Sequence, residues 1–166
     1  MSTHNTATTL SEPTKFLPVL AEMLVHDIPP EKFADRLGTT INHPAFVLGH
    51  CAYYAGVCIT MLGGTVEFGE HESELFDMNA ECDDESDRYP AKDECMAHFT
   101  SRCNEAADYL ASCDPLILAG STDGTSFEGR FSTLGHVAAF MLIGHPSFHL
   151  GQISAWRRVA GMGSAT

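Results

Sequence analysis

The chain has 166 residues, of which 22 are Asp or Glu and 9 are Lys or Arg, so its formal net charge is −13 at pH 7. This length suits one domain that can bury a core of its own. Because a strongly acidic protein repels the phosphate backbone of nucleic acids and the anionic surface of membranes, we predict neither as a partner.

Residues 1–10 are polar and rich in threonine, and they lack the basic start and apolar core of a signal peptide. We interpret them as a disordered tail before a single domain at residues 11–162. Apolar runs elsewhere are interrupted by His, Gly or Pro before they reach the length of a membrane span. We therefore expect a soluble cytoplasmic protein, whose six cysteines are reduced and serve mainly as small apolar packing residues.

The first helix is predicted at residues 11–27, where apolar side chains recur at helical spacing. A break at Pro29 and Pro30 follows, with a short helical turn after it. The second helix is predicted at residues 44–62, with Asn42 as its N-cap and two glycines at its end. Apolar side chains surround nearly the whole circumference of this second helix, so we expect it to be buried.

Residues 65–89 carry ten acidic side chains but lack the ordered Asp-x-Asp-x-Asp-Gly frame of a calcium loop, so we predict a solvated acidic connection. A third helix is predicted at residues 90–113, with Pro90 in its first turn. Residues 114–132 are rich in turn-forming residues and have room for a short hairpin.

The last helix is predicted at residues 133–160, with Ser132 or Thr133 as its cap and Gly161 as its end. Four helices with apolar faces predict an all-α fold, namely an up-and-down four-helix bundle with a long acidic connecting loop.

Two histidines on the last predicted helix, His145 and His149, are the strongest functional signal. Their four-residue spacing puts both imidazoles on one helix face, about 6 Å apart along the axis. Gln152 shares this face. Pro146 lies between the histidines and cannot donate a hydrogen bond to the carbonyl of Leu142, so the helix should kink or widen locally.

His50 is the third candidate, because it lies in a segment, residues 43–65, that contains no charged side chain. A neutral buried imidazole needs a partner, and a metal ion shared with His145 and His149 supplies one. The sequence thus predicts a divalent-metal site made of these three histidines. The alternative is that they are ordinary core residues and that the chain binds no metal.

Other histidine arrangements fit less well. His136 lies nine residues before His145 and so about 180° around a straight helix, and His43 is better placed to begin the second helix. The chain has no Glu-x-x-His pair of the di-iron bundles and no His-Glu-x-x-His motif of zinc proteases.

Two segments, Asn42–His50 and His145–Arg158, resemble those of the DinB/YfiT-like family of metalloenzymes. The resemblance lies in a histidine after a Leu-Gly pair and in a final His-x-x-x-His-x-Gly-Gln pattern; Pro146 is a less usual insertion. It implies a four-helix bundle in which His50, His145 and His149 carry the metal, with Gln152 as a neighbour. It also implies a thiol-dependent S-transferase that uses low-molecular-weight thiols, and it suggests a homodimer.

Three neutral imidazoles leave a metal with an open position, which is the catalytic pattern for zinc. Zinc, nickel and iron(II) all suit imidazole ligands. We therefore predict a metal-dependent enzyme acting on a small molecule, either a hydrolase that activates water or a thiol S-transferase. The sequence assigns no catalytic residue beyond the ligands. The alternative is a non-catalytic metal- or ligand-binding bundle in a stress response.

Overall fold

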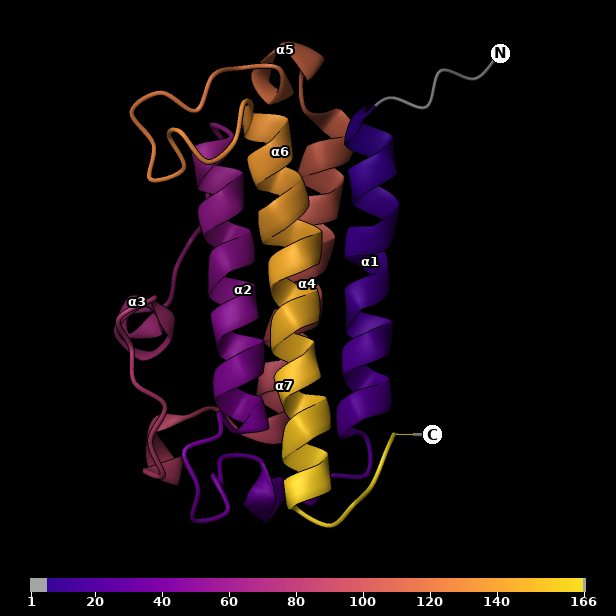
Figure 1. Cartoon of the computed structure of the whole chain (residues 1–166), viewed down its shortest axis with the longest axis vertical. Coiled ribbons are helices and arrows are strands. Elements are labelled where there is room, and N and C mark those ends of the chain that lie inside the picture. The colour runs from indigo at the N-terminus through magenta and orange to yellow at the C-terminus, as the bar shows by residue number, and fades with distance from the viewer. Residues whose placement is uncertain (1–5, 166) are drawn as a thin grey trace.

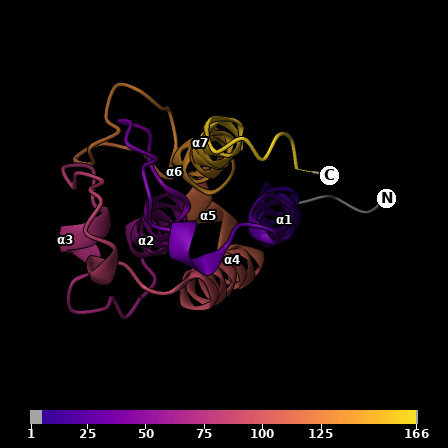
Figure 2. The ribbon, with the colours of Figure 1, turned by 90° about the horizontal axis from the view of Figure 1, so that it is seen from below.

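The computed structural model describes residues 6–165, and every regular element in this range is a helix (Figure 1). The predicted all-α fold is therefore confirmed. Four long helical rods lie side by side: α1 (Thr6–Val25), α2 (Pro44–Met61), α4 (Lys92–Ser112), and α7 (His145–Val159) with its extension α6 (Leu134–Ala139). Viewed along the rods, α1 and α2 lie opposite each other, and α4 and α7 each pack against both (Figure 2).

The order of helix directions differs from the predicted up-and-down bundle. The Tyr109 hydroxyl near the end of α4 donates to the Leu62 carbonyl just after α2, so α2 and α4 run in parallel. Likewise Arg157 near the end of α7 donates to Leu24 near the end of α1, so these two helices are also parallel. The long connection between α2 and α4 explains the difference, because it is long enough to return along the whole bundle (Figure 1).

The predicted disordered tail at residues 1–10 is wrong for residues 6–10, which form the first turns of α1. Ala7 and Leu10 are buried in the core cluster formed with Leu118, Val137 and neighbouring side chains. This burial stabilises a helical start that the polar composition of the segment did not suggest. Residues 1–5 lie outside the described part of the chain.

Helix α2 is buried along most of its length, as predicted, and Gly63 with φ of +90° ends it. Its N-cap is not the predicted Asn42 but His43, whose Nδ1 accepts a hydrogen bond from the Phe46 amide at 3.1 Å. By length and composition α2 could cross a membrane, but 72% of that stretch is buried inside the protein. Such burial is typical of the core helix of a soluble protein.

The acidic segment at residues 65–89 was predicted to be a solvated loop, and this prediction is wrong for part of it. It contains α3 (Glu72–Phe76) and a 3-10 turn (Ser86–Arg88), and it packs against α2. Phe76 is 3% exposed, and buried Glu72 faces Arg102 of α4. The sparse apolar residues of this segment therefore anchor it to the bundle despite its charge.

Gly49 of α2 is the point where α3 approaches most closely. A Cβ atom at this position would lie 2.3 Å from two ring carbons of Phe76. Only glycine leaves room for the Phe76 ring here, so Gly49 fixes where the acidic segment crosses α2.

Residues 114–132 contain α5 (Pro115–Leu118) and turns, and no strand occurs within residues 6–165, so the predicted hairpin is absent from this loop. All six cysteines are free and buried, in agreement with their predicted packing role. Burial raises the pKa of the Cys58, Cys95 and Cys103 thiols to about 12.

Candidate metal centre

The helix rod that carries His145 and His149 widens immediately before them. Residues Phe140–Gly144 form a π-helical turn, and the His145 amide donates to the carbonyl of Phe140, five residues back. This is the local widening predicted from Pro146, which has no amide hydrogen for a regular helical bond. The wide turn joins α6 to α7 and leaves both histidines facing α2.

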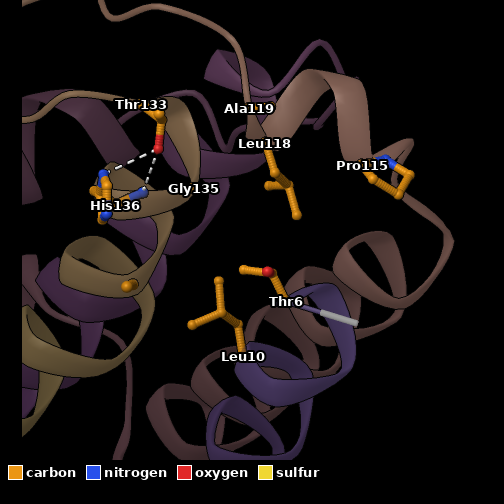
Figure 3. Close-up of a pocket in the computed structure, with 9 residues that line it drawn as sticks. Thr6, Leu10, Pro115, Leu118, Ala119, Thr133, Gly135 and His136 are labelled. Atoms are coloured by element: carbon orange, nitrogen blue, oxygen red, sulfur yellow. Dashed lines mark hydrogen bonds between the residues drawn. The ribbon is translucent and has the colours of Figure 1, made fainter. Parts of the chain in front are cut away.

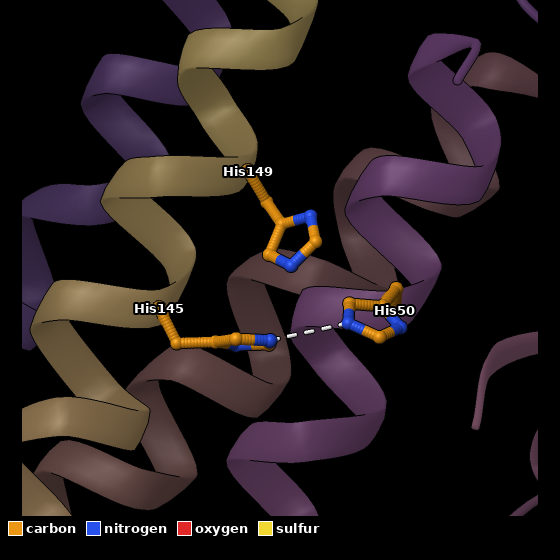
Figure 4. Close-up of side chains that lie close together, drawn as sticks. All are labelled: His50, His145 and His149. Carbon is orange, nitrogen blue, oxygen red and sulfur yellow. Dashed lines mark hydrogen bonds between the residues drawn. The ribbon is translucent and has the colours of Figure 1, made fainter. Parts of the chain in front are cut away.

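The structure brings the three predicted histidines together between α2 and α7 (Figure 4). The Nε2 atoms of His50 and His145 are 3.1 Å apart. One potential ligand nitrogen from each of the three rings lies within 4.8 Å of the other two. In the described residues, no other His, Cys, Asp or Glu belongs to this group.

Hydrogen bonds on the far side of two rings determine which nitrogen faces the cluster. His50 Nδ1 lies 2.8 Å from the Phe76 carbonyl oxygen, which can only accept, so Nδ1 carries the hydrogen and Nε2 keeps its lone pair. His149 Nδ1 lies 3.3 Å from Gln152 Oε1, and Asn42 Nδ2 donates to the same oxygen at 3.1 Å. Such second contacts orient metal-ligating histidines in known sites.

His145 differs from the other two rings. Its Nδ1 is buried and has no hydrogen-bond partner among the described residues. The ring is instead held by aromatic contacts, with the Tyr54 and His50 ring centres 5.3 and 5.0 Å away.

All three imidazoles are held neutral. Burial, with the nearby His149, lowers the pKa of His50 to about 4. Burial, with both other histidines nearby, lowers the pKa of His145 to about 3. Burial also lowers the pKa of His149. Neutral imidazole is the protonation state that ligates a metal, so the cluster needs no deprotonation at pH 7.

The donor set fits a divalent transition metal. Zn–N bonds of about 2.0–2.1 Å in a tetrahedral arrangement put two ligand nitrogens roughly 3.3 Å apart. The His50–His145 separation of 3.1 Å is close to this value. The wider separations in the group, of up to 4.8 Å, would have to shorten by up to about 1.5 Å around an ion. Three nitrogens, with no further His, Cys, Asp or Glu in the group among residues 6–165, correspond to an open coordination sphere.

Two cavities reach the histidines, and both are lined by His50, Asp77 and Met78. The larger, of about 540 Å³, is lined by His50 and His145 together with Tyr53, Tyr54 and apolar side chains. The smaller, of about 400 Å³, is lined by His50 and His149 and by more polar residues. The centre is thus accessible to a small molecule.

The other candidates from the sequence lie elsewhere. His136 does not join the cluster: it lines a separate cavity between α1, α5 and α6, and its Nδ1 is 3.0 Å from the Thr133 hydroxyl (Figure 3). His43 begins α2, as its position suggested. The carbonyl of Phe76 was missed, because a backbone group that reaches a site through tertiary packing leaves no sequence pattern.

No family model matches the chain, and no curated protein and no solved structure shows a significant match to it.

Proposed function

We propose that this protein is a divalent-metal-dependent enzyme in which His50, His145 and His149 hold the ion. A divalent ion in this position supplies a Lewis acid that lowers the pKa of a bound water or thiol. The reaction would be hydrolysis of a small molecule or transfer of a small thiol to an electrophile. The observation that carries the proposal is the convergence of three neutral imidazoles at the inner end of a cavity.

The surrounding residues support a catalytic rather than a closed structural site. Phe76 and Gln152 orient two of the rings from behind, so their Nε2 atoms remain available to an ion. The larger cavity leaves space beside His50 and His145 for a substrate. A structural zinc site would instead need a fourth protein ligand, and no further His, Cys, Asp or Glu joins the three within residues 6–165.

The protein's own cysteines are not suited to act as the attacking thiol. All six are buried, and burial raises the pKa of the thiols, so little thiolate is present at pH 7. In the thiol-transfer form of the proposal, the thiol is therefore a separate small molecule. This agrees with the resemblance to DinB/YfiT-like enzymes, which we retain as part of the proposal together with a cytoplasmic location and a homodimeric state.

Metal content tests the first half of the proposal. Protein purified without a histidine tag is dialysed against Zn²⁺, Ni²⁺ or Fe²⁺, and bound metal is measured by mass spectrometry. We expect one ion per chain in the wild type and a large loss in His50→Ala, His145→Ala and His149→Ala. His136→Ala is the matched control, because this histidine precedes the same helix but lies outside the cluster. Equal metal content in all four variants would overturn the assignment.

Activity assays test the second half of the proposal, namely that the protein is an enzyme. The loaded protein is assayed for hydrolysis of p-nitrophenyl acetate and for transfer of cysteine to 1-chloro-2,4-dinitrobenzene, with His149→Ala as the reference. Metal-dependent turnover in either assay supports an enzyme. Stoichiometric metal without turnover in both favours the alternative of a non-catalytic metal-binding protein.

A further inference from the structure

The larger cavity beside the histidines, here called the apolar cavity, has a wall of aromatic and aliphatic side chains. Tyr53, Val57 and Met61 of α2 form one side, and Phe127, Phe140 and Met141 form the other. Phe127 and Phe140 also contact Phe131, with ring centres 5.8 and 5.6 Å from it, so this wall is packed from behind. A volume of about 540 Å³ suits a drug-sized or smaller organic molecule.

Arg130 contributes the one cationic side chain to the lining of this cavity. Its guanidinium makes no hydrogen bond or ion pair within residues 6–165, whereas the other arginines of the chain are all engaged. Arg88, Arg102 and Arg157 pair with carboxylates, and Arg36 and Arg158 donate to carbonyl oxygens. In a protein with 22 acidic residues, an unpaired arginine at a cavity is a candidate for binding an anion from outside.

Arg130 and the histidines lie at different depths of the cavity. Arg130 is exposed, whereas His50 is buried and His145 is partly buried, so the charge lies at the outer part of the cavity and the histidines lie further in. Asp77 also lines the cavity, but its carboxylate accepts a hydrogen bond from the Asn79 amide at 2.7 Å. A ligand that spans the cavity would therefore meet a cation, then an apolar wall, then the histidines.

We propose that the apolar cavity binds a small aromatic or aliphatic molecule carrying one acidic group, which pairs with Arg130. Its apolar body packs against Val57, Phe127 and Phe140, and its reactive end lies beside His50 and His145. The inference rests on the proposed function for the identity of the reactive end, but the binding mode does not require metal. The smaller cavity is less suited to such a ligand, because its arginine, Arg36, already donates to the Ile41 carbonyl.

Two fluorescent probes that differ by a single acidic group test this proposal. 8-Anilino-1-naphthalenesulfonate carries a sulfonate, and N-phenyl-1-naphthylamine has the same aromatic body without it. Dissociation constants of both are measured by fluorescence titration at pH 7.5 and low salt. A chelator is present throughout, so that contact between a metal and the sulfonate cannot contribute. Arg130→Gln removes the charge at an exposed position, and Arg158→Gln is the matched control on the exposed end of α7.

We expect Arg130→Gln to weaken binding of the sulfonate probe about threefold to tenfold and to leave the uncharged probe within about twofold, as the loss of one partly exposed charge pair predicts. Arg158→Gln should change neither. Val57→Trp, which fills the cavity from α2, should weaken both probes. Circular dichroism and thermal unfolding establish that the variants are folded, since a partly unfolded protein also binds the sulfonate probe.

The proposal is overturned if Arg130→Gln affects both probes equally or neither, or if Val57→Trp leaves both unchanged. Because the titration contains chelator, these outcomes are independent of whether the three histidines bind metal. A protein that binds the probes as expected but takes up no metal would refute the proposed function alone.

Discussion

Replacing Gly49 by alanine should disturb both the packing of α3 and the orientation of His50. The added Cβ would lie 2.3 Å from Cε1 and Cζ of Phe76, so the ring would have to retreat by more than about 1 Å to reach ordinary contact distance. Phe76 has little room to do so, because Phe46 and Tyr89 pack against it. Overpacking of this kind costs about 1–3 kcal/mol, offset by up to about 1 kcal/mol from the better helix propensity of alanine.

The same change should weaken metal binding. The Phe76 carbonyl accepts a hydrogen bond from His50 Nδ1, so displacement of Phe76 weakens this bond and no longer fixes the orientation of the imidazole. Loss of such a second contact lowers metal affinity by about 10- to 100-fold in other proteins. We therefore expect Gly49→Ala to lower the free energy of unfolding by about 1–2 kcal/mol and to bind Zn²⁺ at least about tenfold more weakly.

Gly151→Ala is the matched control, because Gly151 is also helical but a Cβ there has no atom within 4 Å. Urea unfolding should show this control equal to or more stable than wild type, by up to about 1 kcal/mol. Zinc affinity is measured by competition with a chromophoric chelator. If Gly49→Ala is as stable as Gly151→Ala and binds zinc as tightly, the close approach of Phe76 to α2 and its role at His50 are both refuted.

Three further predictions follow from other contacts. Saturating Zn²⁺ at about 100 times its Kd should raise the free energy of unfolding by about 2.7 kcal/mol in wild type but not in His149→Ala; an equal rise in both would contradict binding at the cluster. Burial lowers the pKa of His43 from 6.5 to about 4, so the folded state resists protonation that the unfolded chain accepts. The free energy of unfolding should therefore be highest above pH 6.5 and should fall by roughly 3 kcal/mol as the pH falls toward 4. His43→Asn, which keeps a capping oxygen, should flatten this acid dependence in urea unfolding, and an unchanged slope would exclude His43 as its source. Asp27→Asn leaves the buried Arg157 without its carboxylate partner and should lower the free energy of unfolding by about 1–2 kcal/mol. The loss is limited because Asp27 is partly exposed and Arg157 keeps its hydrogen bond to the Leu24 carbonyl; full stability of this variant would show that the ion pair contributes nothing.

Features that depend on neighbouring residues in the sequence were predicted correctly. The helical character of the chain, the burial of α2 and the widened turn at Pro146 follow from spacing and composition. The grouping of His50 with His145 and His149 was predicted from the uncharged segment around His50 together with the resemblance of the two motifs. The helix directions did not follow, because apolar faces look alike in up-and-down and crossover bundles. Contacts between helix ends distinguish the two, namely Tyr109 with Leu62 and Arg157 with Leu24.

The features that were missed depend on tertiary contacts. Asn42 was expected to cap α2, yet the following residue, His43, takes that role while Asn42 donates to Gln152 across the bundle. The acidic segment was expected to be solvated, because ten carboxylates outweigh the few apolar residues that dock it. Arg130 was not predicted as a binding residue, because its lack of an ion-pair partner within the described residues can be seen only in the structure.

The wide turn at Phe140–Gly144 has a consequence for the helix that contains it. A π-helical turn closes its hydrogen bond over five residues in place of four, so it holds one residue more than a regular α-helical turn. Val137 and Ala138 before it and Leu150 and Ile153 after it are all buried, so the helix keeps its core contacts on both sides of the extra residue. His145 and His149 thus lie beside a turn whose extra residue leaves the buried side chains on both sides in place.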